Sequence, residues 1–443
     1  MNKEKIIELA NYAMSLSKAD QVEVVIMGGE SYLTGFANNY IHRNVGDETY
    51  EMRIRVVFGK KIGAASTSDL SNEAIKSTVE NAESIAKLQK ENKDFVSLPK
   101  NGDLSKKEFE FVAKMPDADT RAEVVKKLVE QSKKKGFNAY GKFETEKFQL
   151  CIKNSLGVEN YFERTGSTLK NIVMTGTSSG FSEESSMSFE DIDYEKISEE
   201  SMESAVRGMN PSTIEPGKYE VILSPYAVEE FLSSMKYLSL SAKNVEEGTS
   251  FMAGHFGERF FPEIITLYDD GLNSETIKMP FDFEGVLKKK VYFVQEGVLK
   301  DVLYDSFYAY KEVKEPTGHA LPQPNDIGGY PMNFIIEKGQ STLEEMISHV
   351  EKGLYIERFW YTNPMDPLHL LITGMTRDGL FLIEHGHTEK PVKHMRFTES
   401  ILNAFKNCLE ISNVSKIIYE DGVTTTAPYM RIKDFNFSSV TEF

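Results

Sequence analysis

The stretch MNPSTIEPGKYEVILSP, residues 209–225, separates two parts of the chain whose sequence patterns differ. Pro and Gly residues interrupt its first half, which is typical of a linker. The run Tyr219–Leu223 is short and apolar and predicts a buried strand. Ser224 and Pro225 are residue types that begin a helix. We therefore expect a domain boundary inside this stretch, with two domains: residues 1–215 and residues 216–443.

Upstream of the boundary, helical and strand patterns alternate. The Ser-rich, acidic tract Ser182–Ser188 favours a loop, and the irregular segment 89–118 favours a long connection that could divide this region into two subdomains. Apolar residues at three- and four-residue steps predict helices near residues 6–16, 71–86, 124–135 and 193–208. Shorter apolar or alternating runs predict strands near residues 22–26, 31–36, 40–45, 52–56, 62–65, 137–152, 157–164 and 168–182.

Downstream of the boundary, many short strands are separated by Gly-containing turns. A helix begins at Ser224 and Pro225, and further helices are expected near residues 341–352 and 398–410. The predicted fold class is therefore α+β: a mixed α/β N-terminal region followed by a β-rich C-terminal domain.

The chain has 443 residues and a formal net charge of −17. Binding to a phosphate backbone needs clustered Lys and Arg, so we expect no nucleic-acid partner. No apolar stretch is long enough for a transmembrane helix, and no apolar leader precedes the first helix, so we expect no membrane association. Cys151 and Cys408 lie far apart in the sequence and fit unpaired thiols in a reducing compartment. Together these features favour a cytoplasmic location.

A series of short motifs, each weak by itself, occurs along nearly the whole chain. The motifs are Gly59–Ser71, Tyr219–Pro225, Asp269–Gly271, Gly297–Lys300, Tyr304–Asp305, Thr317–His319 and Phe381–His387. In their content and order the chain resembles the TldD/PmbA family of cytoplasmic metalloprotease proteins, whose older label is modulator of DNA gyrase. The resemblance implies an α+β N-terminal region and a β-rich C-terminal domain.

The resemblance also implies an assembly. Members of this family form two-subunit complexes that cleave peptides and unfolded segments. A TldD-type subunit holds zinc with a His-Glu-x-x-x-His helix and a later Cys, and a PmbA- or TldE-type subunit pairs with it without a zinc of its own. The expected partners of this chain are therefore a TldD-type catalytic subunit or a second copy of itself, together with a peptide substrate.

The zinc motif of the family is absent from this sequence. Counted from Ser224, the first His, the Glu and the second His of the motif fall on Ser233, Ser234 and Leu238. None of these residues is a good zinc ligand or a general base. The later Cys is missing too, because Cys408 lies earlier, in a predicted helix. The resemblance therefore points to the PmbA/TldE branch, with no cofactor in this chain, zinc in a TldD-type partner, and no catalysis by this chain alone.

A few other residues could contribute to a site. His385 and His387 are two residues apart and form a metal-like pair, although Gly386 between them favours a turn. His255 and His319 lie in Gly-flanked loops that could line a substrate channel. Trp360 belongs to an aromatic segment that could lie in a channel or a subunit interface.

Three functions remain open from the sequence. The first is a PmbA/TldE-type subunit of a metalloprotease complex. The second is a self-sufficient metallopeptidase whose ligands include His385 and His387. The third is a protein-binding modulator of DNA gyrase, since the acidic charge argues against direct contact with DNA but not against contact with a protein.

Overall fold

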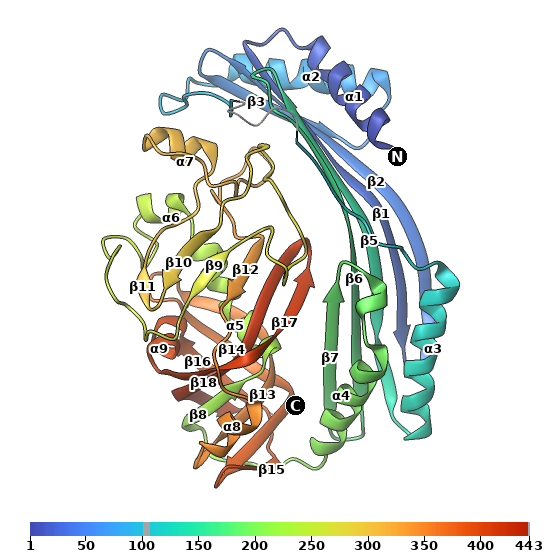
Figure 1. Cartoon of the computed structure of the whole chain (residues 1–443), viewed down its shortest axis with the longest axis vertical. Helices are drawn as coiled ribbons and strands as arrows, with labels where there is room; N and C mark the ends of the chain where they lie inside the picture. Colours follow the sequence, from blue (N-terminus) through green and yellow to red (C-terminus); the bar gives the residue numbers. More distant parts are fainter. Residues whose placement is uncertain (101–106, 442–443) are drawn as a thin grey trace.

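The computed structural model describes residues 1–100 and 107–441, and it places two large β-sheets side by side (Figure 1). The N-terminal sheet is long and curved, with strand order β3-β2-β1-β5-β6-β4 and β7 paired to β6. Its strands are β1 (Gln21–Ala37), β2 (Tyr40–Phe58), β3 (Lys61–Thr67), β4 (Lys107–Phe111), β5 (Asn138–Asn154), β6 (Glu159–Met174) and β7 (Ser179–Ser186).

Strands β1 and β2 are each one long strand, whereas the sequence pattern predicted two short strands in place of each. Their pairing runs without a break from Gln21 opposite Val57 to Gly35 opposite Arg43. The pattern was interrupted by Gly28 and Gly29, which have φ values of +150° and +145°. A Cβ atom on either glycine would lie about 2 Å from a carbonyl oxygen of a neighbouring strand. Only glycine therefore allows β1 to pass this point.

Four helices cover the N-terminal sheet: α1 (Lys3–Leu16), α2 (Asn72–Leu88), α3 (Ala118–Lys134) and α4 (Tyr194–Arg207). Helix α2 begins where its sequence predicted, because the side chain of Ser71 accepts a hydrogen bond from the backbone N–H of Ala74. The predicted loop at Ser182–Ser188 is wrong, since most of it belongs to β7. Ser182 is buried beneath α4 and donates a hydrogen bond to Glu200 at 2.7 Å, so a polar residue occupies an interior strand position.

The C-terminal sheet has strand order β11-β10-β9-β12-β18-β16-β14-β13-β8, with β15 paired to β14 and β17 paired to β18. Its strands are β8 (Gly217–Leu223), β9 (Leu267–Asp269), β10 (Val291–Gln295), β11 (Val298–Leu299), β12 (Asn333–Ile336), β13 (Lys352–Asp366), β14 (Leu371–Glu384), β15 (His387–Pro391), β16 (Met395–Ser400), β17 (Cys408–Glu420) and β18 (Val423–Val440). Its helices are α5 (Pro225–Leu238), α6 (Ala242–Glu246), α7 (Ser306–Lys311), α8 (Leu343–Ser348) and α9 (Ile401–Lys406). The α+β fold class, with a β-rich C-terminal part, is confirmed.

Two C-terminal helices are shorter than predicted, and this changes the position of a cysteine. Helix α9 ends at Lys406, and Asn407 follows as its C-cap. Cys408 is therefore the first residue of β17 and does not lie on a helix. Cys151 and Cys408 are both unpaired and buried. Within the described ranges, no helix is long and apolar enough to cross a bilayer.

The two sheets are held together by polar and apolar contacts. Arg55 on β2 forms ion pairs with Glu23 on β1 and with Glu284 of the C-terminal part, each at 2.9 Å. A buried apolar cluster also joins Val25 and Phe162 of the N-terminal sheet to residues of the C-terminal part. Each sheet is built from residues on one side of the stretch 209–217. The domain limits themselves stay a prediction.

Candidate functional site

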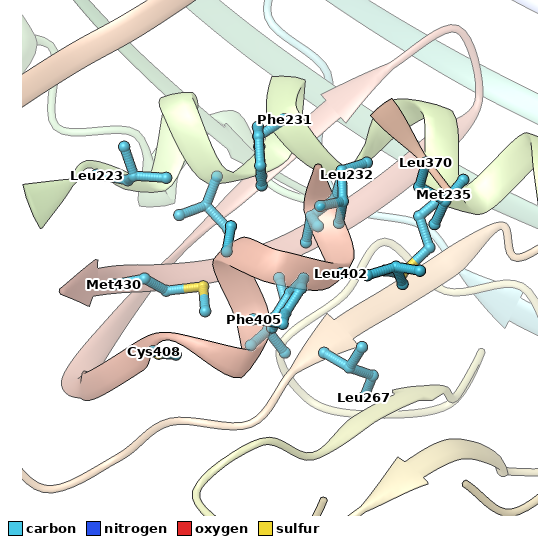
Figure 2. Close-up of a cluster of buried hydrophobic side chains, with 14 of the residues drawn as sticks. Leu223, Phe231, Leu232, Met235, Leu267, Leu370, Leu402, Phe405, Cys408 and Met430 are labelled. Carbon is cyan, nitrogen blue, oxygen red and sulfur yellow. The ribbon is translucent and has the colours of Figure 1, made fainter. Parts of the chain in front are cut away.

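Helix α5, where the resemblance places the zinc motif, is a core helix in this chain. Ser224 directly follows β8 and caps the helix by accepting a hydrogen bond from the backbone N–H of Ala227, and Pro225 occupies the first turn. Phe231, Leu232 and Met235 form a buried stripe along one face of the helix. Figure 2 shows these side chains directed toward the Leu402 and Phe405 side chains of α9. These contacts fix the orientation of the helix in the C-terminal core.

The residues at the three motif positions do not fit a zinc ion. The Oγ of Ser233 donates a hydrogen bond to the backbone carbonyl of Glu230, three residues earlier, at 2.9 Å. Ser234 is half-buried, and Leu238 packs against the hydrophobic core. Zinc requires imidazole, thiolate or carboxylate ligands, and none of these three residues supplies one. The helix therefore keeps its packing face without the ligands.

The carboxylates that α5 does carry already have partners. Glu229 forms an ion pair with Lys236 at 2.8 Å, and Lys236 also donates to the hydroxyl of Thr425. Glu230 accepts a hydrogen bond from the hydroxyl of Thr362 at 2.5 Å, and burial raises the pKa of Glu230. Over residues 1–100 and 107–441, no group of three or more His, Cys, Asp or Glu residues is arranged to hold a metal ion.

The two histidines of the alternative metal pair lie at the surface of a turn. His385 has a φ of +50° and Gly386 a φ of +76°, and together they form the turn between β14 and β15. The Nδ1 of His385 lies 2.6 Å from a carboxylate oxygen of Glu351, and both side chains are about four-fifths exposed. His387 is exposed at the start of β15. This arrangement is the one expected for a solvated turn.

His319 lies in a different environment from the one the sequence suggested. Its side chain has no exposed surface, its Nε2 lies 2.9 Å from Asp269, and its Nδ1 lies 3.0 Å from the hydroxyl of Thr317. Asp269 also forms an ion pair with Lys288 at 2.9 Å. Burial, together with the charge of Lys288, lowers the pKa of His319. Contrary to the expectation of a channel residue, His319 has no surface in this structure that a peptide could contact.

His255 and Trp360, the other two residues suggested for a channel or an interface, are both exposed. The Nδ1 of His255 lies 2.9 Å from a carboxylate oxygen of Glu258, and both side chains are about half exposed. Trp360 lies on β13, is 46% exposed and is covered by the guanidinium of Arg377 at 4.2 Å. Trp360 and Arg377 line a cavity of about 1070 Å³ between the two halves of the chain. Their suggested roles stay predictions.

A second cleft, of about 780 Å³, separates the inner face of the N-terminal sheet from the C-terminal part. Apolar side chains such as Met27 and Phe148 line it together with charged side chains. Arg164 is held in place there, because it contacts Glu146 and the hydroxyl of Tyr419, each at 2.7 Å. The Tyr419 hydroxyl in turn donates to Glu146 at 2.5 Å, which links the two halves across the cleft. The sequence did not indicate this group, because its members lie on three separate strands.

A buried carboxylate lies beside this cleft. Glu183 on β7 is 3% exposed and pairs with Lys170 at 3.1 Å, and Lys170 pairs with Glu420 at the same distance. Burial raises the pKa of Glu183 to about 7, although the charge of Lys170 opposes the rise. One of its carboxylate oxygens has no hydrogen-bond partner among the described residues.

Known proteins resemble this chain in sequence and in fold. A Methanocaldococcus jannaschii protein is 31% identical over 236 residues, which cover 51% of this chain and 53% of that relative. The match therefore spans only about half the length of the relative. A protein named metalloprotease PmbA homolog from Haemophilus influenzae is 23% identical over 386 residues, covering 81% of this chain and 80% of that protein. The crystal structure of TldE from Thermococcus kodakarensis superposes with a TM-score of 0.84 at 19% identity, covering 98% of this chain and 99% of that one, which shows a shared fold.

Two family profiles match the chain itself. The profile described as PmbA/TldA metallopeptidase domain 1 matches residues 22–86, which include β1, β2 and β3. The profile described as PmbA/TldA metallopeptidase C-terminal domain matches residues 216–439, the whole C-terminal sheet up to the last residues of β18. Since this second match alone covers half of the sequence, the chain belongs to the PmbA/TldA metallopeptidase family.

Proposed function

We propose that this chain is the PmbA/TldE-type subunit of a metalloprotease complex that acts on peptides or unfolded segments. The zinc of the complex belongs to a TldD-type partner, and this chain contributes the frame and part of the substrate path. The observation that carries the proposal is the composition of α5. Its motif positions hold Ser233, Ser234 and Leu238, while Phe231 and Met235 keep the helix packed in the core.

The cleft between the two sheets supports a role in holding peptide. It is open to solvent, and apolar and charged side chains line it together. Such a mixed lining accepts an extended chain without strong selection of one side chain. Arg164 and Glu146 in this lining form an ion pair with each other, whereas the other charged residues of the lining are mostly acidic.

The compartment belongs to the same proposal. We place the complex in the cytoplasm, where Cys151 and Cys408 would stay reduced. Both thiols are unpaired and buried, and the chain's net charge of −17 fits a partner that is a protein and not a nucleic acid. The older gyrase-modulator label is compatible with such a protein contact, but no feature of the described surface favours it over the protease complex.

Metal analysis tests the first part of the proposal. The chain is expressed with zinc in the medium, purified without chelator and measured by elemental analysis. We expect less than about 0.1 zinc per chain, because the residues that the structure describes include no cluster of zinc ligands. About one zinc per chain, retained through dialysis, would refute the assignment to a zinc-free subunit.

Reconstitution tests the second part. This chain alone should cleave an unfolded reporter peptide no faster than buffer, and addition of a TldD-type subunit should produce cleavage that a chelator abolishes. The self-sufficient alternative makes the opposite prediction. It would hold if this chain alone shows chelator-sensitive cleavage that survives Ser233→Ala and is lost when His385→Ala and His387→Ala are combined.

A further inference from the structure

The cavity of about 1070 Å³ that Trp360 and Arg377 line is separate from the cleft between the two sheets. On one side its wall is the turn between β6 and β7, residues 174–179, together with residues 208–211. On the other side its wall is formed by β13, β14 and the connection between β15 and β16. Among the described residues, none lines both spaces. A cavity of this size can hold a ligand as large as a short peptide.

The charge around this cavity is opposite in sign to the charge of the whole chain. Arg377, Lys393 and His394 line the cavity, and none of the described lining residues is Asp or Glu. Elsewhere acidic residues are frequent, since 68 of the 443 residues are Asp or Glu and the net charge is −17. The cavity is therefore a local site to which an anion is attracted on an otherwise acidic protein.

The two permanent cations of the cavity are available to a ligand. Within residues 1–100 and 107–441, Lys393 forms no ion pair, and the carboxylate that Arg377 approaches, on Asp378, lies at 4.0 Å, too far for a hydrogen bond. Asp378 already has a closer partner, because it lies 2.6 Å from the guanidinium of Arg358. Neither cation of the cavity is therefore neutralised at close range by a described carboxylate.

His394 adds a neutral hydrogen-bond donor. The hydroxyl of Thr376 accepts the backbone N–H of Met395 at 3.0 Å and lies 3.1 Å from the Nδ1 of His394. The hydroxyl proton is then directed to Nδ1, which assigns the imidazole proton to Nε2. Burial lowers the pKa of His394, although the charge of Asp378 opposes this effect, so the ring is neutral at pH 7. Its Nε2 has no partner among the described residues and can donate to a ligand.

Apolar side chains line much of the remaining cavity. Met174 is 38% exposed and Trp360 is 46% exposed, although both are large and apolar. Met375 lies opposite Trp360 in the β13–β14 pair and also lines the cavity, as does Leu380. Exposed apolar side chains gathered in a concave site mark a surface that an apolar ligand can cover.

We infer that this cavity binds a carboxylate carried on an apolar body. The carboxylate contacts Arg377, Lys393 and His394, since a guanidinium and a carboxylate form paired, charge-assisted hydrogen bonds. The apolar body packs against Met174 and Trp360. Two sources present this chemistry: the free C-terminal end of a peptide whose last residue is apolar, and an alkyl carboxylate. The peptide source rests on the proposed function, in which the cavity would hold the end of a substrate or product outside the cleft.

The fluorescence of Trp360, the single tryptophan of the chain, reports on the cavity without a label. The full chain is titrated with acetyl-alanyl-alanyl-leucine, with the same peptide as its C-terminal amide, with hexanoate and hexanamide, and with inorganic phosphate. We expect a saturable change in fluorescence, with at least one of the two acids binding about tenfold or more tightly than its own amide. The acid that binds more tightly identifies the source of the ligand.

Charge removal provides the second measurement. Lys393→Met and Arg377→Met should each weaken binding of the acid about tenfold. The Arg377 variant is measured by calorimetry, because the guanidinium lies 4.2 Å from the Trp360 ring and affects its fluorescence. Lys390→Met is the matched control, since Lys390 is exposed on β15 outside the cavity, and it should bind as wild type does to within about twofold.

Four results would overturn the inference: no saturable change below about 5 mM ligand, equal binding of acids and amides, phosphate binding as tight as that of the acids, or equal effects of the Lys390 and Lys393 variants. Cleavage by a complex with a TldD-type subunit, when this chain binds no carboxylate, would overturn only this inference. Binding in the cavity by a chain that forms no active complex would remove only the proposed function.

Discussion

Replacing Arg55 by Met should destabilise the chain strongly, because Arg55 neutralises two buried carboxylates at the junction of the two sheets. Arg55 is 8% exposed, Glu23 is 1% exposed and Glu284 is fully buried. Each carboxylate lies 2.9 Å from the same terminal nitrogen of the guanidinium. Met fills a similar volume without charge, so the substitution removes the charge and leaves the packing largely in place.

The expected loss follows from the two charges that remain. Removing one partner of a buried ion pair costs about 3–5 kcal/mol, because the other charge stays buried without compensation. The loss has an upper limit, since a carboxylate can bind a proton at about 1.4 kcal/mol for each unit of pKa shift. Burial already raises the pKa of Glu23, and Arg55 opposes that rise. Without Arg55 the folded-state pKa of Glu23 rises further.

The sign of the pH dependence follows from this shift. When a carboxyl group has a higher pKa in the folded state than in the unfolded state, it lowers the free energy of unfolding as the pH rises from the unfolded-state pKa to the folded-state pKa. The difference between wild type and Arg55→Met should therefore be largest near pH 8. It should shrink by about 1 kcal/mol or more at pH 5, because the carboxyl of Glu23, whose pKa is raised, is more easily protonated there.

Urea denaturation at pH 5 and pH 8 measures both quantities, followed by circular dichroism and by the fluorescence of the single tryptophan, Trp360. Arg53→Met is the matched control on the same strand, because Arg53 pairs with Glu51 at 3.1 Å and both side chains are about one-third exposed. The control should cost less than about 1 kcal/mol. If Arg55→Met costs no more than the control, or if its cost is the same at both pH values, the reasoning fails.

Three further changes test the core, the buried carboxylate and the surface turn. Phe231→Ala should lower the free energy of unfolding by about 3–5 kcal/mol, and Ser233→Ala on the same helix by less than about 1 kcal/mol, both measured by urea denaturation. Ionisation of Glu183 should lower the free energy of unfolding of wild type by up to about 3 kcal/mol between about pH 4.5 and pH 7. Glu183→Gln removes this loss, so the variant should become more stable relative to wild type as the pH rises. Equal pH profiles of the two proteins would contradict the raised pKa. His385→Ala should leave both the melting temperature and the metal content unchanged, whereas a lost metal ion would favour the alternative ligand set.

Much of the fold could be predicted from local signals. Ser71 and Ser224 marked the first turns of α2 and α5 because a helix start needs a side-chain acceptor at that position. The long strands could not be delimited in the same way. Gly28 and Gly29 interrupt the apolar alternation of β1. Glycine is required at these two positions because the backbones of β2 and β5 lie too close for a Cβ atom, and the local sequence does not reveal that contact.

In the candidate site too, features that depend on local sequence could be predicted, and features that depend on distant residues could not. The lack of zinc ligands at positions 233, 234 and 238 was readable directly, because it depends only on residue type at a fixed spacing from Ser224. The burial of His319 was not, since it depends on Asp269, fifty residues away in the chain.

Helix α5 explains how a chain can keep this fold without the zinc chemistry. Its buried stripe, including Phe231 and Met235, supplies the packing, whereas Ser233 lies off that stripe and bonds only to its own backbone. Of the three motif positions, residue 233 therefore lies off the packing stripe, whereas Leu238 packs against the core, so a change at residue 233 should cost less stability than a change at residue 238. The two carboxylates of this helix, Glu229 and Glu230, both form hydrogen bonds with side chains of this chain. A helix that keeps its packing with these residues at the motif positions fits the subunit role that we propose.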